Sequence, residues 1–372
     1  MQQPDGQAVA EGEAARILQI CNACRYCEGF CAVFPAMTRR LAFDRGDIHY
    51  LANLCHNCGA CLHACQYAPP HDFAVNVPRA MAQVRQKTYQ EYAWPGSVGR
   101  LYAHNGTLAA VLSGASIAAF FLVELARRGE LWERNLGANF YILFPHNALV
   151  LIFGVAFAWA VIALFMGVLR FWRDQAPGPV SGPAVREAAH HALALTYLGG
   201  GHGDGCNETD DRFTLIRRRF HHLTFYGFLL CAASTATATL YHYALKRYAP
   251  YPVTSIPVML GALGGIGLTA GCLGLFWLHL RRHSLHGDPA QKPMDRAFMA
   301  MLVGTSVSGL ALLVLRQTTA MGALLAIHLG CVLTLFLALP YSKFSHAAYR
   351  CAALLRWTNE RRQPSQLKLA PD

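Results

Sequence analysis

The sequence of 372 residues contains little charge: charged residues make up 14% of it and hydrophobic residues 54%. An average soluble domain has about a quarter charged residues, so an ordinary soluble domain is excluded. The first 16 residues, MQQPDGQAVAEGEAAR, contain no apolar segment, so we expect no cleavable signal peptide. No glycine motif for a nucleotide is present either, because GALGGIG (261–267) lies inside an apolar segment where glycines serve helix packing. We therefore expect no flavin or nucleotide site.

The basic residues lie beside the apolar segments. The net charge of +11 comes from 32 Lys and Arg against 21 Asp and Glu. Basic residues in this position are typical of loops at the cytoplasmic surface of a membrane. We therefore expect the basic residues to face a lipid bilayer, and we expect no nucleic-acid partner.

Six apolar segments of about 20 residues are long enough to cross a hydrocarbon core of about 30 Å. They are residues 105–126, 147–169, 223–244, 257–280, 297–316 and 321–341. With six spans, most of the basic loops fall on one side. This predicts a multi-pass protein of the inner membrane with both termini in the cytoplasm, although the loop 124–135 places three arginines on the other side.

Eight of the 13 cysteines lie in two runs, CNACRYCEGFC (21–31) and CHNCGACLHAC (55–65), with the same C-x2-C-x2-C-x3-C spacing. This spacing is typical of [4Fe–4S] clusters, and in two-cluster ferredoxins the fourth cysteine of each run binds the other run's cluster. Zinc is the alternative, but it would leave a third cysteine unused in each run. Without an export signal, metal ligation is favoured over disulfides. The predicted ligands are Cys21, Cys24, Cys27 and Cys65 for one cluster, and Cys55, Cys58, Cys61 and Cys31 for the other.

The predicted fold class is all-α, with an α-helical ferredoxin-like module that holds both clusters and a six-helix transmembrane bundle like that of a cytochrome b. The expected parts are a disordered N-terminus (1–15), the two-cluster module (16–95), spans one and two (96–170), a Gly-rich cytoplasmic connector (171–220), spans three to six as a haem-binding core (221–346) and a basic cytoplasmic tail (347–372).

Histidines inside the spans are the second group of candidate ligands, because ionisable side chains there are costly and usually functional. The last span carries His328, and His346 follows 18 residues later, which places both on one helix face. A bend at Pro340 would loosen this registry. The third span carries His221 and His222 at its cytoplasmic end and His242 at its outer end.

Two helices with a histidine in each leaflet suit one or two b-type haems with two axial histidines each. Helical phase favours His221 over His222, but the choice between them stays open. The alternative is that histidines at helix ends only cap carbonyls or meet lipid headgroups. We prefer that interpretation for the histidines outside this set at span ends and in the basic run: His104, His146, His279, His283 and His286.

Two smaller features allow two interpretations each. The glycines around Cys206 in GGGHGDGCNE permit a close approach to a cofactor or another domain, but they equally suit a flexible loop. Four arginines of the cysteine module either shape a docking face for a partner or form a solvated basic surface: Arg25, Arg39, Arg40 and Arg45.

The two cysteine runs, RRRFHHLTFYGFLL, YLGGGHGDGCN and PYSKFSHAAYR together resemble the tricarballylate-utilisation protein B family, also called CitB-type, over residues 16–360. The resemblance implies a membrane iron–sulfur and haem protein. Such a protein reoxidises the reduced FAD of a partner dehydrogenase of the tricarballylate dehydrogenase type and passes electrons to the quinone pool. The histidine arrangement is also similar to the cytochrome b subunit of respiratory nitrate reductase, which has fewer spans.

The residues alone lead to a similar hypothesis: an oxidoreductase subunit without substrate chemistry of its own. Clusters would accept electrons singly from a flavoprotein, and haem would carry them to a quinone near the cytoplasmic ends of spans three and six, with Lys343 nearby. One alternative is a quinol-oxidising subunit that feeds a cytoplasmic reductase. Another is an anchor or transporter with a redox-sensing cluster domain, but the sequence shows no repeated halves of the kind that transporters have.

Overall fold

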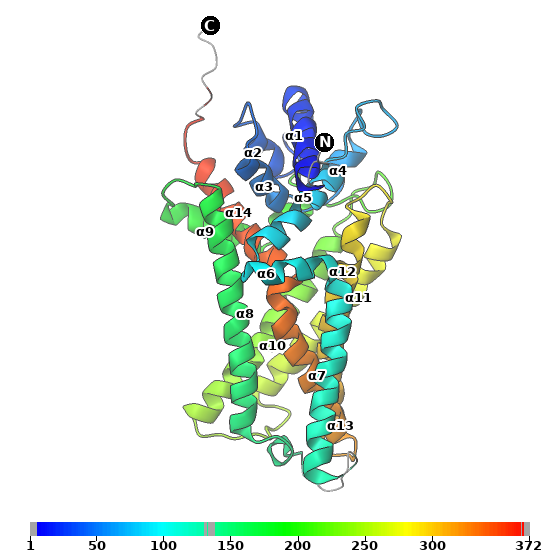
Figure 1. Cartoon of the computed structure of the whole chain (residues 1–372), viewed down its shortest axis with the longest axis vertical. Helices are drawn as coiled ribbons and strands as arrows, with labels where there is room; N and C mark the ends of the chain where they lie inside the picture. Colours follow the sequence, from blue (N-terminus) through cyan, green and yellow to red (C-terminus); the bar gives the residue numbers. More distant parts are fainter. Residues whose placement is uncertain (1–5, 130–131, 133–137, 366, 368–372) are drawn as a thin grey trace.

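The computed structural model describes residues 6–129, 132, 138–365 and 367. Within these residues the chain forms helices and no strand, as predicted, apart from an isolated bridge between Cys206 and Thr214. Figure 1 shows a head of short helices at one end and a bundle of long helices below it. The chain starts and finishes at the head.

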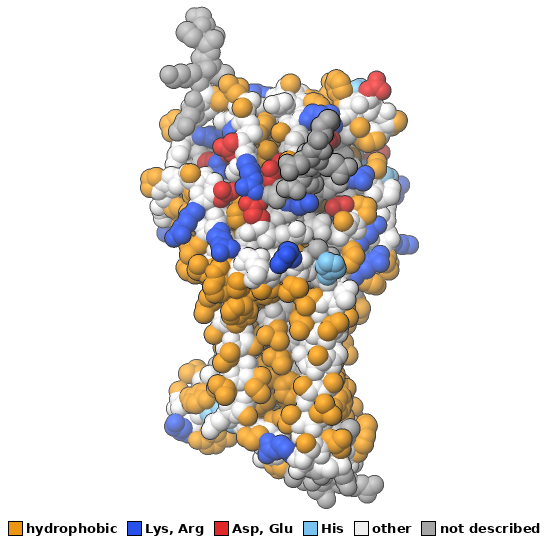
Figure 2. Space-filling model, in the orientation of Figure 1, with side chains coloured by type: hydrophobic (Ala, Val, Ile, Leu, Met, Phe, Trp, Pro, Cys, Tyr) orange, Lys and Arg blue, Asp and Glu red, His pale blue; other side chains and the backbone are white. Residues whose placement is uncertain are grey.

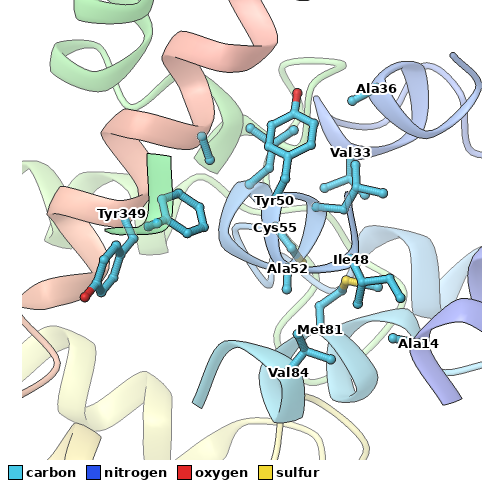
Figure 3. Close-up of a cluster of buried hydrophobic side chains, with 14 of the residues drawn as sticks. Ala14, Val33, Ala36, Ile48, Tyr50, Ala52, Cys55, Met81, Val84 and Tyr349 are labelled. Carbon is cyan, nitrogen blue, oxygen red and sulfur yellow. The ribbon is translucent and has the colours of Figure 1, made fainter. Parts of the chain in front are cut away.

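The head begins with five helices: α1 (Gly6–Cys24), α2 (Val33–Met37), α3 (Arg45–Leu54), α4 (Ala60–His63) and α5 (Val77–Tyr92). The side chain of Asp44 caps α3 by accepting from the backbone N–H of Asp47, and Asn76 caps α5 in the same way. The buried side chains of these helices form one core with Tyr349, which the C-terminal helix contributes (Figure 3).

The prediction of a disordered N-terminus is wrong from Gly6 onward, while residues 1–5 lie outside the described part. Four residues of α1, Ala10, Ala14, Ile17 and Leu18, recur at helical spacing and are buried. The helix packs against α5. Alanines carry little hydrophobic signal in a sequence, but here they allow the close approach of two helices.

Six helices are long and apolar enough to span a membrane, which confirms the predicted number. They are α7 (Asn105–Arg128), α8 (His146–Asp174), α10 (Ile216–Tyr243), α11 (Ile256–Arg281), α12 (Lys292–Leu315) and α13 (Met321–Ala338). Figure 2 shows charged side chains gathered on the head and hydrophobic side chains covering the bundle. Leu151, Val155 and Phe165 of α8 are all exposed, as lipid-facing residues are. The loop 124–135, whose arginines run against the predicted orientation, lies partly outside the described residues.

The remaining helices are short connections between these elements, except the last, α14, which is the C-terminal helix. They are α6 (Gly96–Gly99), η1 (Arg100–His104), η2 (Phe140–Ile142), α9 (Gly182–Leu193), η3 (Thr196–Gly199), η4 (Pro289–Gln291), η5 (Leu339–Tyr341) and α14 (Ser345–Glu360). In the bundle, α10 and α11 make the closest pair. A Cβ on Gly227 would lie 2.5 Å from the backbone nitrogen of Leu268, so only glycine fits there. The glycines of α11 therefore serve helix packing, as the sequence indicated.

The last predicted span does not continue to His346. Helix α13 ends at Ala338, η5 contains Pro340, and α14 starts at Ser345. The missing N–H and the ring of Pro340 oppose a continuous helix here. His328 and His346 therefore lie on separate helices, and the shared-face prediction is wrong.

The predicted basic tail is half helix, and α14 carries it into the head. Ala353, Leu354 and Trp357 of α14 are buried there, and Arg356 Nη2 lies 2.9 Å from Asp47 Oδ1 of α3. The C-terminal helix thus joins the bundle to the cysteine-containing head.

Candidate functional site

The two cysteine runs come together at the ends of α1, α3 and α4. Burial, followed by the neighbouring Cys65, Cys27 and Cys24, raises the pKa of Cys21 to about 12. In the second group, burial followed by Cys58, Cys31 and Cys55 raises the pKa of Cys61. Cys65 of the second run thus lies near cysteines of the first run, and Cys31 of the first run lies near cysteines of the second. The assignment of four ligands to each cluster stays a prediction.

The distances within each group favour a bulky metal centre over zinc. Four zinc thiolates with bonds of about 2.3 Å place their sulfurs about 4 Å apart. Across the described residues, which include all eight cysteines, no three cysteine sulfurs lie within 4.8 Å of one another. A cavity of about 220 Å³ lies between the four cysteines of the first group, and Cys61 of the second group and apolar residues such as Ile20 and Phe34 also line it. The thiols and the space between them fit an iron–sulfur cluster.

The two groups differ in their exposure. Cys24 of the first group is exposed, whereas Cys55 and Cys58 of the second group are buried. Tyr26 and Leu41, near the first group in sequence, are also strongly exposed. The first group therefore lies nearer to the surface of the head than the second.

The glycine-rich connector packs directly against the second group. Gly201 has a φ of +85°, and a Cβ on it would lie 1.8 Å from the carbonyl oxygen of Phe30, so the close approach requires glycine. The backbone N–H of Asn207 donates to the carbonyl of Cys58 over 3.1 Å. Of the two interpretations left open by the sequence, the structure supports close approach to the cysteine site.

Cys206, in this connector, is a further cysteine of the site that spacing alone did not assign. It is fully buried, with its Sγ 3.2 Å from the carbonyl oxygen of Leu198. Cys206 packs beside Cys58, and this neighbour lowers the pKa of Cys58 to about 7. The connector thus places a further thiol beside a predicted cluster ligand.

The histidines form one facing pair. The rings of His221 on α10 and His346 on α14 have centres 6.2 Å apart and planes inclined by 72°. His346 Nδ1 donates to the backbone carbonyl of Lys343, which fixes the tautomer and leaves Nε2 unprotonated. His222 instead stacks on Tyr226 at 5.9 Å. Of the adjacent pair, His221 is thus the histidine whose ring lies near His346.

The other two predicted histidines do not face each other as a pair. His242 stacks on His146 of α8, with ring centres 3.8 Å apart and planes inclined by 10°. His328 places its Nδ1 3.1 Å from Ser308 Oγ on α12. From the sequence, His146 was expected only to lie at a helix end. Its contact with His242 depends on how α8 packs, and no local sequence pattern indicates that packing.

The arginines of the head are mainly structural. Arg40 pairs with Asp47 at 2.6 Å and Glu360 at 2.5 Å, and Arg45 pairs with Glu91 at 2.5 Å. Arg40 therefore joins α14 to the head and is not free to form a docking face. Lys343, expected near the bundle's cytoplasmic end, pairs with Asp295 of α12 at 2.8 Å.

Fold and site together define an all-helical protein with a ferredoxin-like head and a bundle compatible with a multi-pass membrane protein. Residues 14–91 match the family model of the citrate utilization protein B Fer4-like domain, and residues 103–366 match the model of citrate utilization protein B. The chain belongs to the citrate utilization protein B family, which confirms the resemblance found in the sequence. It is 58% identical to citrate utilization protein B of Escherichia coli over 362 residues, which are 97% of this chain and 96% of that protein. No solved structure matches the chain.

Proposed function

We propose that this chain is a membrane electron-transfer subunit that reoxidises a partner flavoprotein and delivers the electrons to a quinone. The observation that carries the proposal is the order in which three candidate sites lie in space. A cysteine group with an exposed member, Cys24, comes first, then the more buried cysteine group, and then the facing histidine pair. The last two are joined directly, because Arg350, on the same helix as His346, donates to the carbonyl of Cys55 over 2.6 Å.

The two cysteine groups would each hold a [4Fe–4S] cluster through four thiolates. Such clusters carry one electron at a time, which divides the two-electron load of a reduced flavin. The exposed position of Cys24 supports contact of the partner with the first group. The buried position of Cys55 and Cys58 supports a role of the second group as the link toward the bundle.

The histidine pair fits one b-type haem. Metal–imidazole bonds of about 2 Å on both sides of an iron place the two ring centres about 6 Å apart. The observed 6.2 Å between His221 and His346 agrees with this geometry. The stacking distance of 3.8 Å between His146 and His242 leaves no room for an iron between them. Of the one or two haems expected from the sequence, we therefore propose one.

The partner would be an FAD-dependent dehydrogenase of the tricarballylate dehydrogenase type. The absence of a nucleotide motif in the sequence supports a partner that performs the substrate chemistry. The relative in Escherichia coli is named for citrate utilization, and this name agrees with a tricarboxylic acid as the partner's substrate.

The protein would lie in the inner membrane with the head and both termini in the cytoplasm. The gathering of basic residues at the head end of the bundle supports this orientation. The quinone would bind near the His221–His346 pair, where Lys343 and Asp295 offer polar groups at the end of the bundle.

The composition of the purified protein tests the proposal. The protein is purified anaerobically in a mild detergent, and iron, sulfide and haem are measured with a reduced-minus-oxidised spectrum and a pyridine haemochrome assay. We expect about eight cluster irons and about one b-type haem per chain. Cluster iron without haem would refute the haem step and favour the anchor or transporter alternative.

A further inference from the structure

Two arginines converge on one backbone carbonyl between the second cysteine group and the histidine pair. Arg85 of α5 donates through Nη1 to the carbonyl oxygens of Ala52 at 2.9 Å and Cys55 at 2.6 Å. Arg350 of α14 donates through Nη2 to the same Cys55 oxygen at 2.6 Å and through Nε to Asn53 at 3.3 Å. The two guanidinium groups are therefore immediate neighbours.

The negative group beside this pair is the Cys55 thiolate, whose backbone carbonyl both arginines bind. Arg85 is 3% exposed, and no carboxylate of the described residues forms an ion pair with Arg85 or Arg350. In contrast, Arg40 pairs with Asp47, and Arg217 pairs with Glu208. Burial and the charge of Arg85 lower the pKa of Arg350 to about 10. Two buried positive charges beside a single thiolate are costly, so a further anionic partner is expected.

The position of Arg350 indicates where that partner would come from. Arg350 follows His346 by four residues on α14, so both side chains project from one face of the helix, one turn apart. Arg350 lies on the turn nearer the head, because α14 runs from the bundle into the head. Burial, followed by the charge of Arg350, lowers the pKa of His346.

The remaining donors suit a carboxylate. Arg350 Nη1 and Arg85 Nε and Nη2 have no acceptor in the described part of the chain. A guanidinium group binds a carboxylate through two parallel hydrogen bonds, and such charge-assisted bonds are strong. A b-type haem held by His346 would bring two propionate carboxylates, which the free donors of Arg350 and Arg85 would suit.

We propose that Arg350, supported by Arg85, binds a propionate of the haem held by His221 and His346 and raises the reduction potential of that haem. This inference rests on the function proposed above. Arg350 is a positioning residue in this role. It would link the haem to the second cysteine group, because the same side chain is bonded to the carbonyl of Cys55.

The haem midpoint potential of Arg350 variants tests the inference. In Arg350→Gln, the loss of the positive charge should lower the reduction equilibrium constant of the haem at least about tenfold, which is 59 mV for one electron. Arg350→Lys keeps the charge without the paired hydrogen bonds, so its potential should fall between those of Arg350→Gln and the wild type. Arg316→Gln is the matched control, because Arg316 also donates to a backbone carbonyl, that of Tyr251, at the opposite end of the bundle.

Each outcome decides the inference. It is supported if Arg350→Gln lowers the potential, or loses haem while keeping its cluster iron, and Arg316→Gln does neither. It is overturned if Arg350→Gln retains haem of unchanged potential, if it loses only cluster iron, or if the control behaves identically. If Arg350→Gln yields no folded protein, Arg350→Lys decides in the same way. A wild-type protein without haem would refute the proposed function itself, so the two failures are distinguishable.

Discussion

At the scale of single residues, the site depends on how a few side chains face each other. Cys206 contacts Cys58, and His221 faces His346, whereas the adjacent His222 faces Tyr226. The first two contacts join segments far apart in the sequence. They therefore give each residue a separate and testable role.

The thiol of Cys206 should raise the potential of the second cluster, because an S–H donor beside the Cys58 sulfur stabilises the reduced, more negative state. A net hydrogen bond of about 1 kcal/mol corresponds to about a fivefold change in the reduction equilibrium. Cys206→Ala should lower the potential of one cluster by this factor, measured in a redox titration followed by electron paramagnetic resonance. Cys272→Ala, which removes a buried thiol of α11, is the control. An equal shift in both variants, or no shift in Cys206→Ala, would contradict this role.

The adjacent histidines allow a matched comparison. His221→Ala should lose the haem, because it removes one of the two facing imidazoles, whereas His222→Ala should retain it. The pyridine haemochrome assay measures the haem content, and the iron and sulfide content shows that the head is intact. Loss of haem in His222→Ala with retention in His221→Ala would refute the pairing seen in the structure.

At the scale of secondary-structure elements, the contact between α10 and α11 holds His221 in place. Glycines allow the two helices to approach so closely that backbone atoms touch. A Cβ on Gly227 would lie 2.5 Å from the nitrogen of Leu268, and a Cβ on Gly271 would lie 2.5 Å from the nitrogen of Thr224. The helix that presents His221 is therefore fixed by packing along its length.

Gly227→Ala should separate α10 from α11 and destabilise the protein by about 1–3 kcal/mol, the usual cost of overpacking. Thermal unfolding in detergent, compared with the wild type, measures the effect. Gly114→Ala in α7 is the control, because a Cβ there meets nothing within 4 Å. If both variants unfold at the same temperature as the wild type, the close contact is not a stabilising feature.

The sequence predicted these elements unevenly. Cysteine spacing is local, so it predicted the Fer4-like head, and hydropathy predicted the six long helices. The stacking of His242 on His146 depends on how the helices pack, and the separation of His346 from the helix of His328 depends on the break at Pro340. The role of Arg350 also escaped prediction, because its acceptor is a backbone carbonyl that no side-chain pattern reveals.

At the scale of the whole molecule, α14 connects the two parts of the protein. It carries His346 at the end of the bundle, donates from Arg350 to Cys55, and pairs Arg356 with Asp47 in the head. A single rigid helix thus sets the distance between the predicted cluster and the predicted haem. The central claim is that electrons cross this junction on their way to the membrane.

Anaerobic stopped-flow reoxidation of the chemically reduced protein tests that claim most directly. A water-soluble quinone is mixed with the reduced wild type and with His346→Ala, and the haem and cluster absorbances are followed separately. We predict that the quinone reoxidises both centres in the wild type, and that the clusters of His346→Ala, which lacks haem, are reoxidised at least about tenfold more slowly. Equal rates of cluster reoxidation in the two proteins would contradict the account.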